Sequence, residues 1–395
     1  MKKILFYCQH ILGIGHLIRS MQLVRGLSED FEICFINGGE VIPEFEISPS
    51  IEVINLPALK TDTEFQTLQV VGSDRSLAEV QEIRKNQLLQ IFDRFQPDLF
   101  LIELFPFGRK QFRFELLPLL DRIQATGRKT KVVCSLRDIV VGKKNQVAHE
   151  AKVCDLMNQY FDLLLVHSDR HFMPLDVSFS RSQDLNCPIY YTGYVVQPLS
   201  QERDLSEADQ IALSRPEPMI LTSIGGGRFG HELVDAVLRS APILAATLPH
   251  HIHLFAGPFM PEDKYDALQQ QAAGLTNLTV RRYTGRLLDY MQKAELSISM
   301  GGYNTTMNVL TTGVRSLMLT FMGNGDREQE IRALALQEQG ILTMLTPEDL
   351  ETAVFTQKVL DSLQTFPAPA QIDLEGVAKT TQLLKQFAQA MAIAA

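Results

Sequence analysis

The alternation of short apolar runs with longer amphipathic stretches is the feature that most constrains how this chain can fold. Runs that are apolar at nearly every position predict strands buried on both faces, and the stretches between them predict helices. That order predicts parallel sheets covered by helices on both faces. In the first half, a helix is expected over residues 16–29, and strands are expected over residues 3–8, 31–36, 51–56, 98–104, 131–135 and 163–167.

A polar segment containing Pro198, Pro216 and Pro218 interrupts the alternation, which then starts again. The second series predicts a helix from about residue 231 and strands over residues 219–223, 251–255, 278–283, 296–299 and 317–321. We therefore predict an α/β protein with two doubly wound, Rossmann-like domains facing a central cleft, with ligands bound beyond the carboxyl ends of the strands. The expected parts are a first domain (1–196), a linker with a short helix (197–217), a second domain (218–375) and a C-terminal helix packing back toward the first domain (376–395).

The composition limits the classes of partner. Hydrophobic residues make up 45% of the 395 residues, which is enough for large buried cores. A formal net charge of −9 argues against a protein that binds nucleic acid or a strongly anionic membrane. No run of about 20 apolar residues occurs, so we expect no membrane-spanning helix. Gln9, His10 and two glycines interrupt the N-terminal apolar run, which therefore predicts a strand and its loop rather than a signal peptide.

The cysteines are few, widely spaced and odd in number, without a C-x-x-C pair. This pattern predicts buried, reduced thiols in a cytoplasmic protein. Peripheral contact with the inner face of the membrane is left open. The five residues are Cys8, Cys34, Cys134, Cys154 and Cys187.

The loop over residues 225–230 reads GGGRFG and formally matches the dinucleotide-binding pattern G-x-G-x-x-G. That pattern also requires an acidic residue after the next strand, which here ends in Ala256 and Gly257, so NAD or FAD binding is disfavoured. A glycine loop that leads into a helix can still bind an anion through backbone N–H groups and the helix dipole, here beside Arg228. The alternative is a tight turn that needs glycine for positive φ angles.

The first glycine loop places Gly13, Gly15 and His16 between the first strand and the first helix. A histidine at this position is a candidate general base, because its pKa lies near working pH. Arg19 follows one helical turn later, where it can orient the surroundings of His16, contact substrate or be solvated.

A third loop, over residues 301–306, joins Gly301 and Gly302 to Asn304, Thr305 and Thr306 at a helix N-terminus, which again predicts an anion site. Asp326, Glu328 and Gln329 come after the next strand and could bind sugar or ribose hydroxyls. For Asp326, helix capping is the alternative.

Further candidates follow other strands of the first half. Glu103 could be a base or could orient His16, and Phe105 and Arg109 come after it in the block ELFPFGRK, a mixture that suits a sugar, phosphate or lipid headgroup. Asp138, which follows Arg137, and His167 occupy corresponding positions after their own strands.

The blocks GIGHLIRS, ELFPFGR and GGYNTT resemble a group of bacterial predicted glycosyltransferases. The stretch over residues 301–340 resembles the C-terminal donor domain of the bacterial lipid I N-acetylglucosaminyltransferase of peptidoglycan synthesis. The resemblance spans nearly the whole chain and implies a GT-B fold, an inverting mechanism and no catalytic metal; the chain contains no D-x-D. It implies a nucleotide-sugar donor, with a UDP-sugar favoured, no other cofactor, and a hydroxyl acceptor that is a small molecule, a glycan or a lipid-linked molecule.

Residue by residue, the resemblance implies that the glycine loops hold the diphosphate, that Thr284 lies beside the base and that Glu328 and Gln329 lie near the donor sugar. Asn308 stands where that family usually has a ribose-binding glutamate, and Arg332 replaces an asparagine. The catalytic candidates are His16, Glu103 and Asp138, and the acceptor-binding candidates are Gly13, Arg19, Phe105 and Arg109. The donor-binding candidates are Gly15, Gly225, Gly226, Gly227, Arg228, Thr284, Gly301, Gly302, Asn304, Thr305, Thr306, Asn308, Glu328 and Gln329.

Three hypotheses share these residues. A hexosyl- or N-acetylhexosaminyltransferase would use a base to activate an acceptor hydroxyl, and a nucleotide-sugar hydrolase would activate water with the same residues. A non-catalytic nucleotide-sugar binder would keep the donor site and lack the base. A nucleotide-sugar 2-epimerase is disfavoured, because the second half shows no dedicated acid and base cluster.

Overall fold

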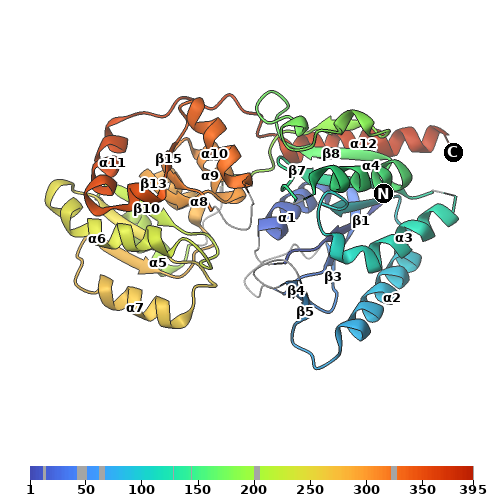
Figure 1. The fold of residues 1–395 in the computed structure, drawn as a ribbon, viewed down its shortest axis with the longest axis horizontal. Coiled ribbons are helices and arrows are strands. Elements are labelled where there is room, and N and C mark those ends of the chain that lie inside the picture. Colours follow the sequence, from blue (N-terminus) through green and yellow to red (C-terminus); the bar gives the residue numbers. More distant parts are fainter. Residues whose placement is uncertain are drawn as a thin grey trace. The chain divides into compact units, whose positions relative to one another are not determined.

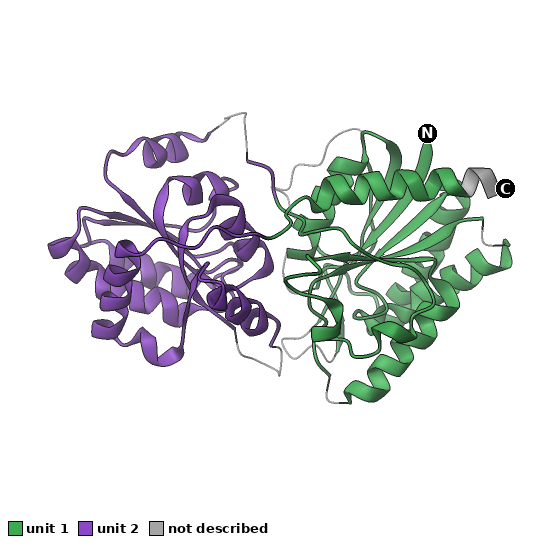
Figure 2. Ribbon diagram, turned by 90° about the horizontal axis from the view of Figure 1, so that it is seen from above, with its two compact units in different colours: residues 1–196, 372–395 green, residues 197–371 purple. Residues whose placement is uncertain are grey.

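The computed structural model describes residues 1–11, 15–41, 51–61, 67–127, 129–143, 145–199, 205–321 and 327–394. These residues form two compact units, coloured separately in Figure 2. Unit 1 comprises Met1–Val196 together with Ile372–Ala395, and unit 2 comprises Gln197–Gln371. The residues expected to form a linker are therefore part of unit 2, and unit 2 ends before the expected residue 375.

Unit 1 is built on a seven-stranded sheet with the order β3-β2-β1-β6-β7-β8-β9, in which every neighbouring pair is parallel. All six strands expected in this half are present. The short edge strand β9 and the antiparallel pair β4 and β5 were not predicted; each is three residues long, which is too short to show a clear periodic pattern. The strands are β1 (Lys2–Cys8), β2 (Phe31–Asn37), β3 (Glu52–Asn55), β4 (Leu59–Thr61), β5 (Leu68–Val70), β6 (Leu99–Glu103), β7 (Lys131–Arg137), β8 (Leu163–His167) and β9 (Ile189–Tyr191).

Helices cover both faces of this sheet, as Figure 1 shows. In β1, Leu5 and Tyr7 join the core under α2, α3 and α4, whereas Ile4 and Phe6 join the core under α1 and α12. This alternation explains why the strands are apolar at successive positions. The helices are α1 (Gly15–Leu27), α2 (Leu77–Phe95), α3 (Arg113–Ala125), α4 (Gln146–Tyr160) and α12 (Gly376–Ala394), with 3₁₀ turns at Lys110–Phe112, Leu175–Val177 and Ser182–Asp184.

The C-terminal helix α12 returns to unit 1 and packs on α1. Gly26 of α1 lies directly against Val377, so that a Cβ atom at this position would overlap the valine side chain. Leu384 and Ala388 of α12 are buried in the same core as β1 and α1. Glycine at position 26 therefore permits the close approach of the two helices.

Unit 2 contains a six-stranded parallel sheet with the order β12-β11-β10-β13-β14-β15 and one apolar core. Its five expected strands are present, and the three-residue edge strand β15 was missed. The strands are β10 (Met219–Ser223), β11 (His251–Phe255), β12 (Leu278–Arg281), β13 (Ala294–Met300), β14 (Arg315–Leu319) and β15 (Thr343–Leu345). The helices are α5 (Glu207–Ser214), α6 (His231–Thr247), α7 (Glu262–Ala272), α8 (Leu287–Lys293), α9 (Tyr303–Thr312), α10 (Glu328–Glu338) and α11 (Thr352–Gln364), with a 3₁₀ turn at Pro347–Leu350.

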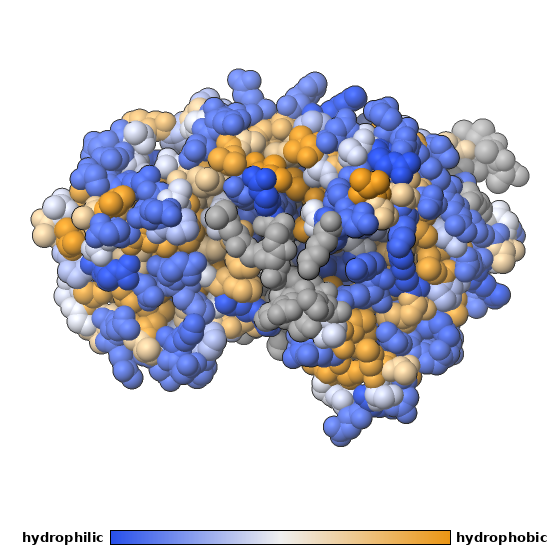
Figure 3. All heavy atoms as spheres, viewed as in Figure 1, coloured by the Kyte–Doolittle hydropathy of each residue, from blue (hydrophilic) through white to orange (hydrophobic). Residues whose placement is uncertain are grey.

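The surface visible in Figure 3 is mostly hydrophilic, as expected when apolar side chains fill internal cores. Figure 3 shows hydrophilic side chains over much of the visible face, with apolar side chains in small groups among them. All five cysteines lie in the described part of the chain and are buried and unpaired, as expected. Within the described residues, no helix combines the length and the apolar character that crossing a bilayer requires.

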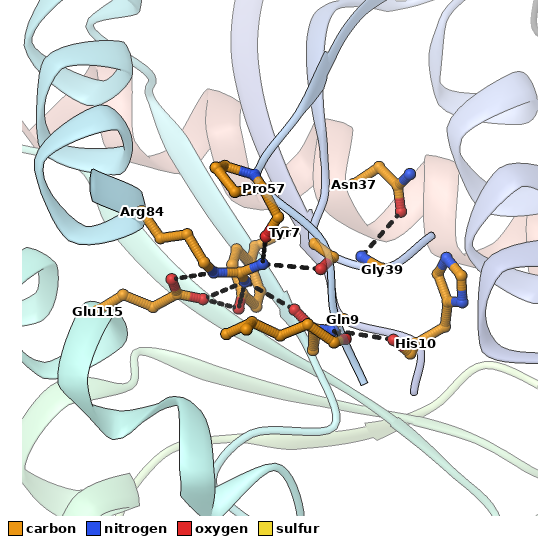
Figure 4. A network of polar contacts seen from close by, with 10 residues as sticks. Tyr7, Gln9, His10, Asn37, Gly39, Pro57, Arg84 and Glu115 are labelled. Atoms are coloured by element: carbon orange, nitrogen blue, oxygen red, sulfur yellow. Dashed lines mark hydrogen bonds and ion pairs between the residues drawn. The ribbon is translucent and has the colours of Figure 1, made fainter. Parts of the chain in front are cut away.

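A fully buried ion pair between Arg84 of α2 and Glu115 of α3 fastens the loops of unit 1 to its sheet (Figure 4). The Arg84 guanidinium donates to both Glu115 carboxylate oxygens, at 2.8 and 2.6 Å, and to the Gln9 side chain at 2.7 Å. It also donates to the carbonyl oxygens of Gly38 and Pro57, each at 2.8 Å. One side chain thus ties two helices to the segments that follow β1, β2 and β3.

Removal of this arginine should destabilise unit 1. Arg84→Ala leaves the Glu115 carboxylate buried without its partner, so we expect the free energy of unfolding to fall by about 3–5 kcal/mol. Lys85→Ala is the matched control, because Lys85 pairs with Glu82 at the exposed surface and should cost less than about 1 kcal/mol. Denaturant titrations of the full chain measure both values, and equal losses would contradict the assigned role of Arg84.

Candidate active site

A histidine–carboxylate pair lies at the carboxyl edge of the unit 1 sheet. His16 is the second residue of α1, just beyond β1, and Glu103 ends the neighbouring strand β6. The His16 Nδ1 atom lies 2.7 Å from the Glu103 Oε1 atom. Arg19, one turn further along α1, donates to the same carboxylate oxygen. From the sequence, Glu103 and Arg19 were each expected as possible residues that orient His16, and the parallel pairing of β1 with β6 brings the three together.

Burial and charge determine the protonation of this pair. Burial alone would raise the pKa of Glu103, but His16, Arg19 and Arg109 lower that pKa to about 2. Burial lowers the pKa of His16 to about 3, with Arg109 and Arg137 acting in the same direction and Glu103 opposing them. At neutral pH the carboxylate is therefore ionised and the imidazole is neutral.

The tautomer of His16 follows from its partner. An ionised carboxylate can only accept a hydrogen bond, so Nδ1 carries the proton and donates it to Glu103. The lone pair of the imidazole is then on Nε2, on a side chain that is 17% exposed. This arrangement can take a proton from a hydroxyl group or from water.

The lowered pKa of His16 predicts a pH dependence of stability. Between pH 6.5 and pH 4.5 the unfolded chain binds a proton at this residue and the folded chain does not, so the unfolding free energy falls as pH falls. His16→Asn should remove this contribution and reduce the slope by up to about 1.4 kcal/mol per pH unit. Denaturant titrations across this range provide the measurement, with His171→Asn, at an exposed histidine, as the control. If the unfolding free energy of His16→Asn depended on pH as steeply as that of the wild type, the lowered pKa of His16 would be refuted.

The side chains of several other candidates in unit 1 are fully buried. Asp138 is fully buried and accepts a hydrogen bond from the Tyr194 hydroxyl at 3.4 Å, so its carboxylate is not accessible to an acceptor. Phe105 is fully buried against Phe161, with ring centroids 6.4 Å apart, and cannot contact an acceptor through its side chain. Both ring nitrogens of the buried His167 are occupied, by Ser135 and by Thr192, each at 2.8 Å. Gly13 lies outside the described residues.

The glycine loop of unit 2 is shaped by close packing of backbone on backbone. Gly225 and Gly227 have φ angles of 64° and 84°. A Cβ atom on Gly227 would overlap the Ala256 carbonyl oxygen and lie 2.9 Å from the Met260 backbone nitrogen. The N–H groups of Gly225 and Gly227 point to the Ser223 hydroxyl at 3.3 Å and the Ile224 carbonyl at 3.4 Å. The tight-turn interpretation therefore explains these two glycines, and their role in anion binding remains a prediction.

Two substitutions in this loop separate conformational strain from steric overlap. Gly225→Ala adds a methyl group into open space and should cost only the positive-φ strain, about 1–2 kcal/mol. Gly227→Ala adds the same strain and also forces the turn over residues 256–260 to move, so we expect about 1–3 kcal/mol more. Denaturant titrations compare the two variants. If both variants lost the same free energy of unfolding, the close contact of Gly227 with the backbone of residues 256–260 would not contribute to stability.

The N-terminus of α9 remains a candidate anion site of unit 2. Gly302 precedes the helix without capping it through a side chain, and the space around its Cα is open. The first N–H groups of a helix have no partner within the helix and face outward with the positive end of its dipole. Thr306 is not part of this exposed edge, because its buried hydroxyl donates to the Gly302 carbonyl at 3.0 Å. Thr305 and Asn308 are also buried.

Candidates from α10 lie next to this edge. The Gln329 side-chain oxygen accepts from the Phe321 backbone N–H at 3.0 Å and lies 3.4 Å from the Cβ position of Gly301. Glu328 is buried and accepts from Arg332 at 2.5 Å, so its carboxylate serves an ion pair on its own helix. The Arg332 guanidinium also lies 5.3 Å from the ring centre of Tyr303, which begins α9. Asp326 lies outside the described residues.

Thr284 is part of a different network. Its hydroxyl donates to Asp209 at 3.2 Å and accepts from the Arg286 backbone N–H at 3.0 Å. The Asp209 carboxylate also accepts hydrogen bonds from Arg281 at 2.7 Å and from the Tyr290 hydroxyl at 2.9 Å. The side chain of Thr284 therefore links α5 to the end of β12, and its proposed contact with a nucleotide base would have to use the backbone.

One aromatic pair near the same edge was missed. Phe229 follows β10 and Phe321 follows β14, the two strands that flank β13, and their ring centroids lie 4.6 Å apart. Phe229 is 45% exposed. The sequence does contain a signal for this pair, because Phe229 lies inside a glycine loop. The neighbouring residues of such a loop offer little apolar surface to bury a phenylalanine. Arg228, also exposed, stacks instead on Phe259 at 5.0 Å. In the described part of the chain, no three His, Cys, Asp or Glu side chains gather as metal ligands would.

Part of the chain matches a known domain family. Residues 221–386 match the glycosyltransferase family 28 C-terminal domain. An uncharacterized glycosyltransferase of Methanosarcina mazei is 28% identical over 158 residues, which cover 40% of this chain and 37% of that relative. Another, of Methanosarcina acetivorans, is 22% identical over 88% of this chain and 86% of its own length. The UDP-N-acetylglucosamine–N-acetylmuramyl-(pentapeptide) pyrophosphoryl-undecaprenol N-acetylglucosamine transferase of Moorella thermoacetica is 24% identical over 44% of this chain and 48% of its own length.

Solved structures establish the fold. A calicheamicin glycosyltransferase superposes with a TM-score of 0.61 at 16% identity, covering 99% of both chains. A protein described as a putative UDP-N-acetylglucosamine 2-epimerase from Listeria monocytogenes superposes with a TM-score of 0.63 at 13% identity, covering 97% of this chain and 95% of that one. The expected GT-B fold with two Rossmann-like units is thus confirmed, and the domain match and curated relatives support a glycosyltransferase.

Proposed function

We propose that this protein is an inverting, metal-independent glycosyltransferase that transfers a hexosyl or N-acetylhexosaminyl group from a nucleotide-sugar to an acceptor hydroxyl. The observation that carries the proposal is the pair formed by His16 and Glu103, with its 2.7 Å separation. His16 Nε2 takes the proton of the acceptor hydroxyl while that oxygen attacks the anomeric carbon. Glu103 keeps the imidazole in the required tautomer and stabilises the imidazolium that forms.

Inversion follows from a single displacement. The acceptor oxygen forms its bond to the anomeric carbon as the bond to the nucleoside diphosphate breaks, so the new bond lies on the opposite face of the sugar. A retaining enzyme that works by double displacement needs a carboxylate as nucleophile. Glu103 is fully buried and pairs with His16 and Arg19, which suits an orienting role and not nucleophilic attack.

Unit 2 would hold the donor. In the proposed arrangement, the first N–H groups of α9, behind Gly301 and Gly302, stabilise the diphosphate and the charge that develops on it as it leaves. Gln329 beside Gly301 would bind the donor sugar. Asn308 would contact ribose less strongly than a glutamate does. We therefore propose a nucleotide-sugar donor without restricting its base to uracil.

A nucleotide-sugar hydrolase is the second candidate, because a neutral histidine with an oriented Nε2 lone pair activates water as readily as a hydroxyl. The two candidates differ in the fate of the sugar. Release of free sugar at turnover rates without any acceptor would identify a hydrolase, whereas formation of a conjugate would identify a transferase.

The test begins with calorimetric binding of UDP-, GDP- and dTDP-sugars, followed by turnover of the bound donor with candidate sugar and lipid-linked acceptors. His16→Ala should lower kcat by about 10²–10⁴-fold and leave donor affinity unchanged, because the base acts only in the chemical step. His171→Ala, which removes an exposed histidine, should behave as wild type. Wild-type kcat in His16→Ala would show that the base is misassigned. Donor binding without turnover for any acceptor would support a non-catalytic binder.

A further inference from the structure

Two arginines besides Arg19 lie at the sheet edge that carries the proposed base. Arg109 follows β6 and Arg137 ends β7, and these parallel neighbours bring both residues to the sheet edge that carries Glu103. Arg19 is matched by Glu103. Arg109 and Arg137 both act on His16 electrostatically and lower its pKa.

The two arginines also act on one another. Burial lowers the pKa of Arg109, and Arg137 lowers it further, while Glu103 raises it. Like charges in a partly desolvated place repel. An anion between them would convert this repulsion into attraction.

Arg109 differs from a buried arginine with a structural task. Arg84 donates to a carboxylate, a side-chain amide and two carbonyl oxygens. The Nε atom of Arg109 is buried and has no hydrogen-bond partner, and no carboxylate of the described residues lies within ion-pair distance of this guanidinium. The residue as a whole is only half-buried. A buried donor without an acceptor destabilises the folded chain, and a bound oxyanion would supply the missing acceptor.

Other charged groups at this edge do not occupy that role. Burial and Arg109 lower the pKa of the buried His10, whereas Glu40 and Asn37 raise it. Asp138 follows Arg137 but is fully buried, with the Tyr194 hydroxyl as a partner. Neither carboxylate is among the principal influences on Arg109.

We propose that Arg109 and Arg137 bind an anionic oxygen group, a phosphate or a carboxylate, carried by the acceptor close to the hydroxyl that His16 deprotonates. The inference deepens the proposed function and rests on it. It assigns the acceptor to phosphorylated or carboxylated hydroxy compounds and excludes neutral sugars as a class. A guanidinium suits this task, because its planar donors match the oxygens of either group.

Three small compounds with the same carbon skeleton test the proposal: glycerol, glycerol 1-phosphate and glycerate. Calorimetry with the full chain, in the presence of saturating UDP to occupy the donor site, measures their affinity. We expect binding of one or both anions and no measurable binding of glycerol. The preferred anion distinguishes a phosphate from a carboxylate site. Absence of binding by both anions, or equal binding of glycerol, would overturn the proposal.

Substitutions of the two arginines test where the anion binds. Arg109→Gln and Arg137→Gln should each weaken the anion by about tenfold or more, while Arg109→Lys keeps the charge and should retain part of the affinity. Arg122→Gln on the exposed face of α3 makes the same change in net charge and should leave affinity unchanged. Anion binding that survives both glutamine variants would place the anion elsewhere.

These measurements involve no turnover, so they separate the two proposals. Anion binding that depends on Arg109, combined with wild-type kcat in His16→Ala, would refute the base and keep the anion site. The reverse result would keep the base and refute the anion site. Unfolding transitions of each variant confirm that a lost affinity does not reflect a lost fold.

Discussion

The fully buried Glu103 carboxylate, placed between His16 and Arg19, is the interaction on which the proposed chemistry depends. A buried carboxylate is costly unless it is paired, and here one partner is a permanent cation and the other is a neutral imidazole. Because Arg19 balances the charge, His16 need not be protonated to stabilise Glu103, and it remains available as a base. The two partners lie one helical turn apart on α1, so a single element provides both.

The parallel sheets explain why the candidate residues collect where they do. Strands that run in the same direction bring every following loop to one edge, where the glycine loops of unit 2 and the described polar candidates of both units lie. At that edge the residues divide between two tasks. Gly227, Thr284 and Glu328 maintain the shape of the edge through packing and internal hydrogen bonds, whereas the helix dipole at the first turn of α9 would attract a bound anion.

The strands and the pair of His16 with Glu103 could be predicted from the sequence, because apolar runs mark buried strands and each residue directly follows a strand end. Position alone could not reveal whether a loop side chain points outward. Phe105 and Arg109 come from one block, yet the first is in the core and the second is half-buried. The hydrogen bond of Thr284 to Asp209 could not be predicted, because Asp209 lies 75 residues away in the segment expected to be a linker. Edge strands such as β9 were missed because three partly exposed residues carry too little periodic signal.

The packing of α12 on α1 has a consequence for how the protein is made. Unit 1 consists of residues 1–196 and 372–395, so all of unit 2 is synthesised between its two parts. A ribosome adds about 5–20 residues per second, and domains generally fold as units as the chain emerges. Unit 2 is continuous and can fold as soon as it has left the ribosome. Unit 1 must wait, with the α1 face around Gly26 uncovered, until Val377 and the rest of α12 arrive. The element that carries the proposed base is therefore among the last to complete its core.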